Sequence, residues 1–353
     1  MSRILVPGSA RILTRSAAPV QTRGLTLNST TAFNREFSLA ESIGIINREA
    51  PAPSELGARL PWSERGVTQR TVSFQDYGHK LEVVEPKTWN GAEPQVKGKP
   101  KRSLMPLEIY HHPLQSTLQA SEIQGKLKIG QTEITPETVE NAVADVAGAH
   151  RRDHEATWEK NRGLTMRGLI QNPHGGYDNV YEMLKSKQSS MAMAPNSAGF
   201  KLRKSLTAAK RTIEKTLASQ YRIRGYAFIA GSDLFDALTN CADFDSIVDR
   251  QAEGAARRDD IRGGYTLAGV NLSSYDHAEY IAANKGYICP IVDDFYLSLF
   301  APMDHFETNN RQGLPFYANA WTSPNGKVLT IDSESNAIHI AVVPEAIIEV
   351  TLS

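Results

Sequence analysis

Disulfides, long apolar runs and an excess of either charge are all missing from this sequence of 353 residues. The two cysteines, Cys241 and Cys289, are too few for a disulfide framework and are predicted to be reduced core residues. The 39 basic and 39 acidic side chains cancel, which argues against a dedicated nucleic-acid-binding protein. No apolar run approaches the ~18 residues of a membrane span, so no membrane partner is expected. What is present, 41% apolar residues, is enough for hydrophobic cores in roughly two or three domains.

The short motifs of common enzymes are also missing. The sequence contains no G-x-x-x-x-G-K-[ST], no G-x-G-x-x-G and no G-x-S-x-G. Two pairs of adjacent carboxylates, Asp259–Asp260 and Asp293–Asp294, diverge in a strand or turn, whereas an acid/base pair needs groups that converge from separate elements. The sequence therefore predicts neither a catalytic residue nor a bound cofactor.

Two pairs of histidines are candidate metal ligands. His150 and His154 share one helix face in a pattern that approaches the inverted zinc-protease motif, but Asp153 stands where that motif needs a glutamate. Two adjacent arginines would repel the ion, and no third ligand is apparent. His111 and His112 are neighbours in a strand-rich segment and would point in opposite directions. The sequence therefore predicts no metal site, and it favours histidines on a solvated or interfacial helix end.

Acidic residues are absent from the first 35 positions, and the first carboxylate is Glu36. This segment is rich in Ser, Thr, Ala and Pro, which favours an extended arm over a packed domain. The same composition is typical of an organelle transit peptide, so that alternative stays open. A secretory signal is not expected because there is no continuous apolar stretch. The basic residues of the segment are Arg3, Arg11, Arg15, Arg23 and Arg35.

Residues 65–118 carry strand signals interrupted by prolines, which are typical of edge or unpaired strands. A long two-stranded arm is marginally stable in water unless it lies on another surface. We expect that surface to be another copy of the chain.

Residues 135–162 are predicted to form one long helix that begins with Thr135 as N-cap and ends at Gly163. Its first half has one apolar face, and its second half is charged nearly all round. The segment from Leu164 to Leu184 is predicted to be a hairpin that turns at residues 172–176.

Residues 200–219 are predicted to form a second helix with a single apolar stripe and otherwise basic faces. From Gly225 onward the pattern is mixed α and β. A buried strand is expected at 226–230, a short helix capped by Ser232, a hairpin around Gly269, and buried strands at 295–300, 337–343 and 346–350.

Two basic clusters remain as candidate contact surfaces. One comprises Lys97, Lys99, Lys101 and Arg102, and the other is the basic face of the helix at 201–215. Either could meet a polyanion or an acidic neighbour, or could simply be solvated.

The order of these parts resembles one family, the lambda-type major capsid proteins of tailed phages (phage capsid protein E family). The resemblance runs from about residue 38 to residue 353. Its most specific stretch reads FAPMDHFETNN at 300–310, followed by GLPFYA at 313–318. Further stretches are LPWSERGV at 60–67, SEIQG at 121–125, NRGL at 161–164 and RDDIRGGY at 258–265.

The resemblance implies an α+β fold, the HK97-like (Hong Kong-type) phage capsid fold with an N-terminal arm, an extension loop, a peripheral domain with a long spine helix, and an axial domain. The implied boundaries are an arm at 1–60, an extension loop at 61–120, a peripheral domain at 121–219 with its spine helix at 135–162, an axial domain at 220–325, and C-terminal strands at 326–353 that return to the peripheral domain.

The function that the resemblance implies is a major capsid protein. It would assemble in the host cytoplasm into hexamers and pentamers of an icosahedral shell around double-stranded phage DNA, with a scaffold, a portal and a decoration protein as further partners. Residues expected at contacts between copies are Trp89, Lys97, Lys99, Lys101, Arg102, Arg151, Arg152 and Asp153. Residues expected to face the interior or the DNA are Arg3, Arg11, Arg15, Lys204, Lys210 and Arg211.

Two alternatives stay open. The same fold could form the shell of an encapsulin-like nanocompartment around a cargo enzyme. The acid-free arm could instead be a cleavable targeting segment on an enzyme.

Overall fold

Five sheets and one 28-residue helix organise the residues that this computed structural model describes, which are 38–48, 54–77, 102–123, 139–218, 220–244 and 261–353. All of them belong to one unit, residues 37–353. The expected arm at 1–35 lies outside the described residues.

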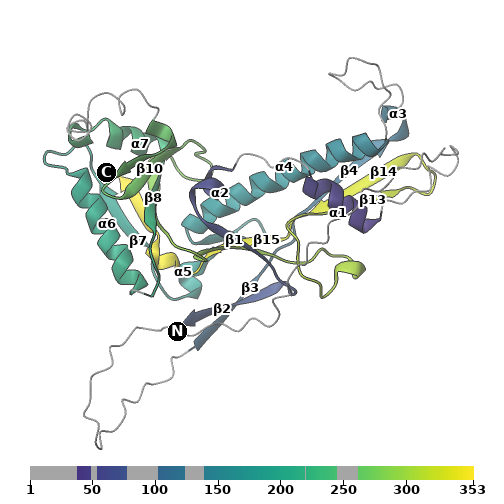
Figure 1. Cartoon of the computed structure of the whole chain (residues 1–353), viewed down its shortest axis with the longest axis horizontal. Helices are drawn as coiled ribbons and strands as arrows, with labels where there is room; N and C mark the ends of the chain where they lie inside the picture. Colours follow the sequence, from purple (N-terminus) through teal and green to yellow (C-terminus); the bar gives the residue numbers. More distant parts are fainter. Residues whose placement is uncertain (1–37, 49–53, 78–101, 124–138, 219, 245–260) are drawn as a thin grey trace, which may run out of the picture. The chain divides into compact units, whose positions relative to one another are not determined.

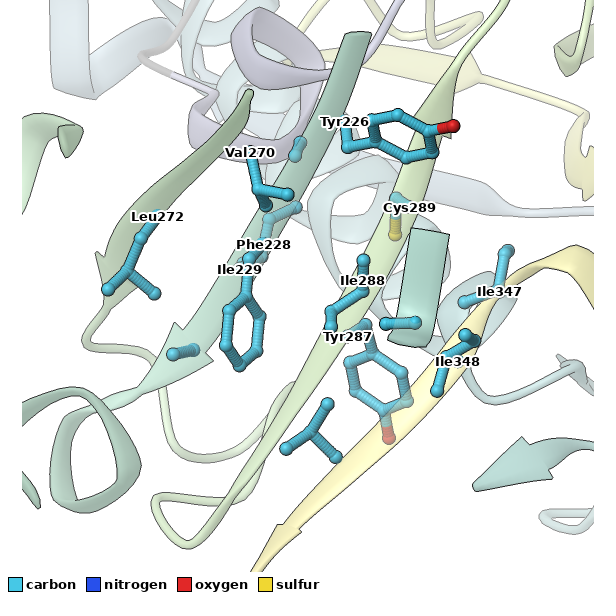
Figure 2. Close-up of a cluster of buried hydrophobic side chains, with 14 of the residues drawn as sticks. Tyr226, Phe228, Ile229, Val270, Leu272, Tyr287, Ile288, Cys289, Ile347 and Ile348 are labelled. Carbon is cyan, nitrogen blue, oxygen red and sulfur yellow. The ribbon is translucent and has the colours of Figure 1, made fainter. Parts of the chain in front are cut away.

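The largest sheet has six strands in the order β7-β16-β11-β8-β10-β9. The pairs β8–β10 and β7–β16 are parallel, and the others are antiparallel. Buried side chains of this sheet form the main core (Figure 2). The six strands are β7 (Ser189–Met193), β8 (Gly225–Gly231), β9 (Tyr265–Leu267), β10 (Val270–Tyr275), β11 (Lys285–Ile291) and β16 (Ile348–Leu352).

The apolar stripe predicted for the second helix is confirmed. Helix α6 (Leu202–Leu217) buries that whole stripe in the core of the six-stranded sheet, and each of its five members is at most 2% exposed. The stripe consists of Leu202, Leu206, Ala209, Ile213 and Leu217.

Helix α7 (Ser232–Thr239) lies where a short helix was predicted, but the predicted cap is wrong. Gly231 is the N-cap residue, and no side chain caps the helix. A Cβ at Gly231 would overlap the carbonyl oxygen of Ala282. Close packing of two backbones, rather than a side-chain hydrogen bond, therefore determines where this helix begins.

Helix α4 (Val139–Met166) is the predicted long helix, but it does not end at Gly163. The predicted first residues, 135–138, lie outside the described residues. The helix continues because Leu164 and Met166 are buried, at 3% and 0% exposure, and their burial outweighs the poor helix propensity of one glycine. Gly163 faces Tyr280, whose Cβ lies 3.0 Å from where a side chain would begin. The chain turns instead at Gly168, which has a φ of +65°.

Two three-stranded sheets pack along α4 (Figure 1). One has the order β1-β12-β15 and the other β13-β14-β4. Helices α1 (Leu39–Arg48) and α2 (Glu55–Arg59) also pack on α4. The strands are β1 (Trp62–Gly66), β4 (Pro113–Gln119), β12 (Tyr296–Phe300), β13 (Tyr317–Thr322), β14 (Val328–Glu334) and β15 (Ala337–Ala341).

The hairpin predicted around Gly269 is confirmed, and the one predicted at 164–184 is present but shorter, because residues 164–166 belong to α4 and residues 180–183 form a short helix. Strands β5 (Leu169–Gln171) and β6 (Tyr177–Asn179) pair across the turn at 172–176, and β9 pairs with β10 across Gly269, which has a φ of +76°. The remaining elements are β2 (Thr71–Tyr77), β3 (Arg102–Glu108), α3 (Ala120–Ile123), α5 (Val180–Met183), η2 (Ile261–Gly263), η3 (Phe306–Thr308) and η4 (Pro344–Ala346).

Two elements assigned to the expected peripheral domain pack with the six-stranded sheet. Helix α6 falls within the expected peripheral segment, and β16 falls among strands expected to return to it. Both share one core with β8 and β11, and the expected boundaries stay a prediction. The β-pairing of β16 with β7 and β11 accounts for this placement, because an inner strand satisfies its backbone groups on both sides.

Candidate assembly surfaces

The ribbon expected to contact another copy is formed by β2 and β3, which among the described residues form a sheet of their own. Their ladder joins seven residue pairs, from Thr71 with Glu108 to Tyr77 with Arg102. The flanking strands of the expected loop, β1 and β4, pair with β12 and β14 of the two sheets on α4. The ribbon is therefore narrower than the predicted range 61–120, because the ends of that range are parts of larger sheets.

Apolar packing fixes the base of this ribbon. Its side chains meet a face of β12 and β15, and the backbone N–H of Ile109 donates to the carbonyl oxygen of Arg70 at 2.7 Å. This cluster consists of Leu107, Ile109, Leu299, Ala301, Ile338 and Ile340, with Val67, Val72, Ile170 and Leu297 packed against it.

Polar contacts add to the base. Arg70 forms an ion pair with Asp304 at 2.8 Å, and Arg65 forms one with Asp294 at 2.6 Å. The Ser63 hydroxyl also donates to Asp294 at 2.7 Å, and this hydrogen bond, together with Arg65, lowers the pKa of that carboxyl. Exposed pairs of this kind contribute little stability. They orient the base of the ribbon rather than hold the fold together.

Two glycines allow the backbone to cross at this base. The N–H of Gly313 donates to the carbonyl oxygen of Val67 at 2.9 Å. A Cβ at Gly313 would overlap the carbonyl oxygen of Phe300, and a Cβ at Gly66 would overlap that of Gly313. The base of the ribbon and the loop that ends at Gly313 are thus in direct backbone contact.

Half of the eight residues expected at contacts between copies lie outside the described residues. Trp89, Lys97, Lys99 and Lys101 lie in the undescribed stretch 78–101, and Arg102 is the first residue of β3. Their role stays a prediction.

Arg151 has ion-pair and hydrogen-bond partners within its own chain, and its expected contact with another copy stays a prediction. Its guanidinium forms an ion pair with Glu155 at 3.0 Å and donates to the carbonyl oxygens of Ile46 and Asn47 at 3.1 and 3.0 Å. It also lies over the Phe316 ring, 5.0 Å from the centroid. Arg151 therefore fastens α1 to α4.

Arg152 and Asp153, the other two expected contact residues on α4, have exposed side chains. They stay available for contact with another copy, and that role stays a prediction.

The expectation that His150 and His154 lie on a solvated or interfacial helix end is wrong. They are 5% and 2% exposed, and both form hydrogen bonds to the hydroxyl of Ser333 in β14, at 2.9 and 3.0 Å. His150 also forms one to Ser116 in β4, at 2.7 Å. Burial lowers the pKa of both, to about 4 for His154, where His150 and His112 lower it further. Neutral histidines here join the helix to the sheet.

Two buried charged residues, Glu159 and Arg162, lie where the second half of α4 meets α2, β1 and the six-stranded sheet. Glu159 accepts hydrogen bonds from the N–H of Leu56 at 2.8 Å and from the hydroxyl of Tyr275 at 3.2 Å. Arg162 donates to Ser54 at 3.0 Å and lies over the rings of Trp62 and Trp158. Only the alternation of charge and aromatic residues in the sequence could have indicated this cluster, and the sequence analysis missed it.

The basic residues of α6 that were expected to face the interior or the DNA differ in their surroundings. Lys204 and Arg211 are exposed on the side opposite the buried stripe, where a polyanion could reach them. The Nζ of Lys210 instead donates to the carbonyl oxygen of Ala268 at 3.0 Å and lies over the Tyr226 ring. Lys210 therefore supports the β9–β10 turn. Arg3, Arg11 and Arg15 lie outside the described residues.

The described part of the chain was also predicted to hold two reduced core cysteines and no metal site. Cys241 and Cys289 are buried free thiols, and burial raises the pKa of Cys289 to about 12. No group of three or more His, Cys, Asp or Glu side chains among the described residues could hold a metal ion. None of the described helices combines the length and apolarity that crossing a membrane requires.

Comparison with known families gives one match that spans nearly the whole chain. The family described as phage major capsid protein E matches residues 38–352. A comparison with curated protein sequences gives no match.

Comparison with known structures gives the same kind of protein. The mature capsid of bacteriophage PhiM1 is similar at a TM-score of 0.51 and 10% identity, over 86% of this chain and 88% of that one. The cyanophage Pam1 capsid has a TM-score of 0.51 and 10% identity, over 86% and 93%. The capsid of Myoviridae phage XM1 has a TM-score of 0.50 and 8% identity, over 84% and 91%. At these identities the similarity establishes the HK97-like fold alone.

Proposed function

The chain belongs to the phage major capsid protein E family and forms the shell of a phage, and we propose that its β2–β3 ribbon builds this shell by lying across a neighbouring copy. It is a structural protein of the virion that assembles into a multimer. The family match favours this function over a nanocompartment shell and over a targeted enzyme.

The pairing of the ribbon supports this proposal. Within the described part of the chain, β2 and β3 have no other partner strand, while each of the flanking strands pairs with a larger sheet. A two-stranded ribbon has only marginal stability by itself in water. A surface on a second copy would cover it and stabilise the assembly at the same time.

A contact of this kind determines how the copies are arranged in a shell. A ribbon that reaches from one copy onto a different face of the next makes a heterologous contact, and such contacts close into rings. We expect hexamers and pentamers in an icosahedral shell around double-stranded DNA. Lys204 and Arg211 of α6, with Arg3, Arg11 and Arg15, would face that DNA through contacts that do not depend on sequence. A scaffold, a portal and a decoration protein would be the other partners, and assembly would occur in the host cytoplasm.

The contacts suggest how the domains of such a subunit divide. The sheets that pack along α4 would form the peripheral domain. The six-stranded sheet with α6 and α7 would form the axial domain, and it would include β7 and β16. The joint between them would be the cluster around Glu159 and Arg162.

Electron microscopy of the purified chain tests the proposal. Wild-type protein is expected to form closed shells of uniform size. A variant in which a short Gly-Ser turn replaces residues 73–106, so that Val72 and Leu107 of the apolar base remain, is expected to stay folded by circular dichroism but to form no shells. A matched control replaces residues 173–175, in the exposed β5–β6 turn, in the same way and should assemble. Normal shells from the 73–106 variant would contradict the proposed role of the ribbon.

A further inference from the structure

We infer that the loop from Pro302 to Pro315, which presents the ring of Phe306, is a contact surface for a second copy of this chain. This inference rests on the proposed function and identifies a surface that the ribbon does not include. The loop joins β12 to β13 and contains the 3₁₀ helix η3.

Exposure of apolar side chains marks this loop. Phe306 is 94% exposed, which is far more than any other large apolar side chain in the described part of the chain. Leu314, in the same loop, is 42% exposed. Two of the six large apolar side chains that are exposed among the described residues therefore lie in one short segment.

The loop is held in place from inside, so the exposure of Phe306 does not come from a loose segment. The Thr308 hydroxyl is within hydrogen-bond distance of the carbonyl oxygens of Met303 at 2.8 Å and His305 at 2.9 Å. The N–H of Glu307 donates to the His305 ring at 3.3 Å. Met303 and Thr308 point inward, at 4% and 6% exposure, and Phe306 between them points outward.

Contacts with the rest of the chain add to this rigidity. The N–H of Asp304 donates to Glu334 at 3.1 Å, and the side-chain amide of Asn336 donates to the carbonyl oxygen of Pro302 at 3.3 Å. A large aromatic ring fixed in this way loses little conformational freedom on binding, which is typical of an interface anchor.

A second copy is the occupant that the surrounding contacts favour. The loop is joined to the base of the β2–β3 ribbon by the Arg70–Asp304 ion pair and by the hydrogen bond from Gly313 to Val67. A second copy that contacts the base of the ribbon would therefore also meet this loop. The surface around Phe306 carries both signs of charge, with Arg70 and Arg311 beside Asp304 and Glu307, so it offers a polyanion no excess of positive charge.

Substitution of Phe306 tests the inference. Phe306→Asp is expected to lower the yield of shells at least tenfold, and Phe306→Tyr to retain it, as measured by sedimentation and electron microscopy. As unassembled subunits, both variants should melt within about 2 °C of the wild-type subunit, because an exposed side chain contributes little to the stability of the fold. Asn309→Ala, at an exposed position on the same loop, is the control and should assemble normally.

The outcomes separate this inference from the proposed function. If wild-type protein forms no shells, the proposed function fails. If wild type and Phe306→Asp both assemble normally, only the role of the loop is wrong. Electron microscopy of wild-type shells at side-chain resolution gives a second measurement, in which the Phe306 ring should be buried against a neighbouring copy. A ring left in solvent, or covered by a different protein, would overturn the inference.

Discussion

Three buried histidines, two between α4 and β14 and one between β12 and β15, are expected to make the stability of the subunit depend on pH. His150 and His154 form hydrogen bonds to Ser333, and His339 forms one to Ser298 at 2.9 Å. Burial lowers the pKa of all three. The sequence analysis placed the first two on a solvated or interfacial end of the helix because Arg151, Arg152 and Asp153 stand between them. Spacing by four residues on one buried face was the better guide.

Acid should therefore destabilise the unassembled subunit. His154 is neutral when folded, with a pKa of about 4 against 6.5 when unfolded, so the unfolded state binds more protons between these values. Stability is complete above pH 6.5 and falls as the pH drops towards 4, by up to roughly 3 kcal/mol for this group. Urea unfolding measured at several pH values checks this. His154→Asn should flatten the dependence, while His174→Ala, at an exposed turn, should leave it as in wild type.

Two neighbouring arginines on α4 should behave differently. Arg151→Ala removes the ion pair to Glu155 and the hydrogen bonds to α1, and should lower the free energy of unfolding of the subunit by about 2–4 kcal/mol. Arg152→Ala, at an exposed position, should change it by less than about 0.5 kcal/mol. Chemical denaturation measures both. If Arg151→Ala unfolds like wild type but blocks assembly, Arg151 acts between copies after all.

Periodicity predicted the elements well where one face alone is apolar. The stripe of α6 and the turn glycine of the β9–β10 hairpin follow from local spacing. The end of α4 could not be predicted from local spacing, because Gly163 ends a helix only when nothing packs against the residues beyond it. Met166 is fully buried, and this tertiary contact carries the helix past the glycine.

Two glycines should respond oppositely to the same substitution. Gly44 lies inside α1 with nothing within 4 Å of an added Cβ, so Gly44→Ala should stabilise the subunit by roughly 0.5–1 kcal/mol. At Gly313 the added Cβ would overlap the Phe300 carbonyl, so Gly313→Ala should destabilise it by about 2 kcal/mol or more. Thermal unfolding compares the two. Equal effects would mean that the backbone crossing at the ribbon base is not tight.

The family and the HK97-like fold could be predicted from the order of motifs along the sequence, while the grouping of strands into sheets could not. Pairing of β16 with β7 and β11 joins segments far apart in the chain, and no local pattern records such a contact. The exposure of Phe306 could not be predicted either, because the sequence of a polar loop does not show whether the ring of a phenylalanine in it points inward or outward.

Charge reversal on the predicted contact cluster tests the whole assembly. Changing Lys97, Lys99 and Lys101 to Glu should lower shell yield more at about 0.05 M salt than at about 0.5 M, because high salt already screens such pairs. Light scattering follows assembly at both salt concentrations. Matched reversal of Lys204 and Arg211 on α6, which are expected to face the interior, should leave empty-shell formation intact. An equal loss at both concentrations would indicate packing rather than charge.

The position of β16 has a consequence for how each subunit is made. Residues 348–352 lie between two strands that the ribosome has already produced, so the largest sheet of a nascent chain stays open until these residues have been synthesised. Until then the facing edges of β7 and β11 lack their partner, and the core beneath them is incomplete. A polypeptide that lacks these residues therefore cannot present the same surfaces as one that has them.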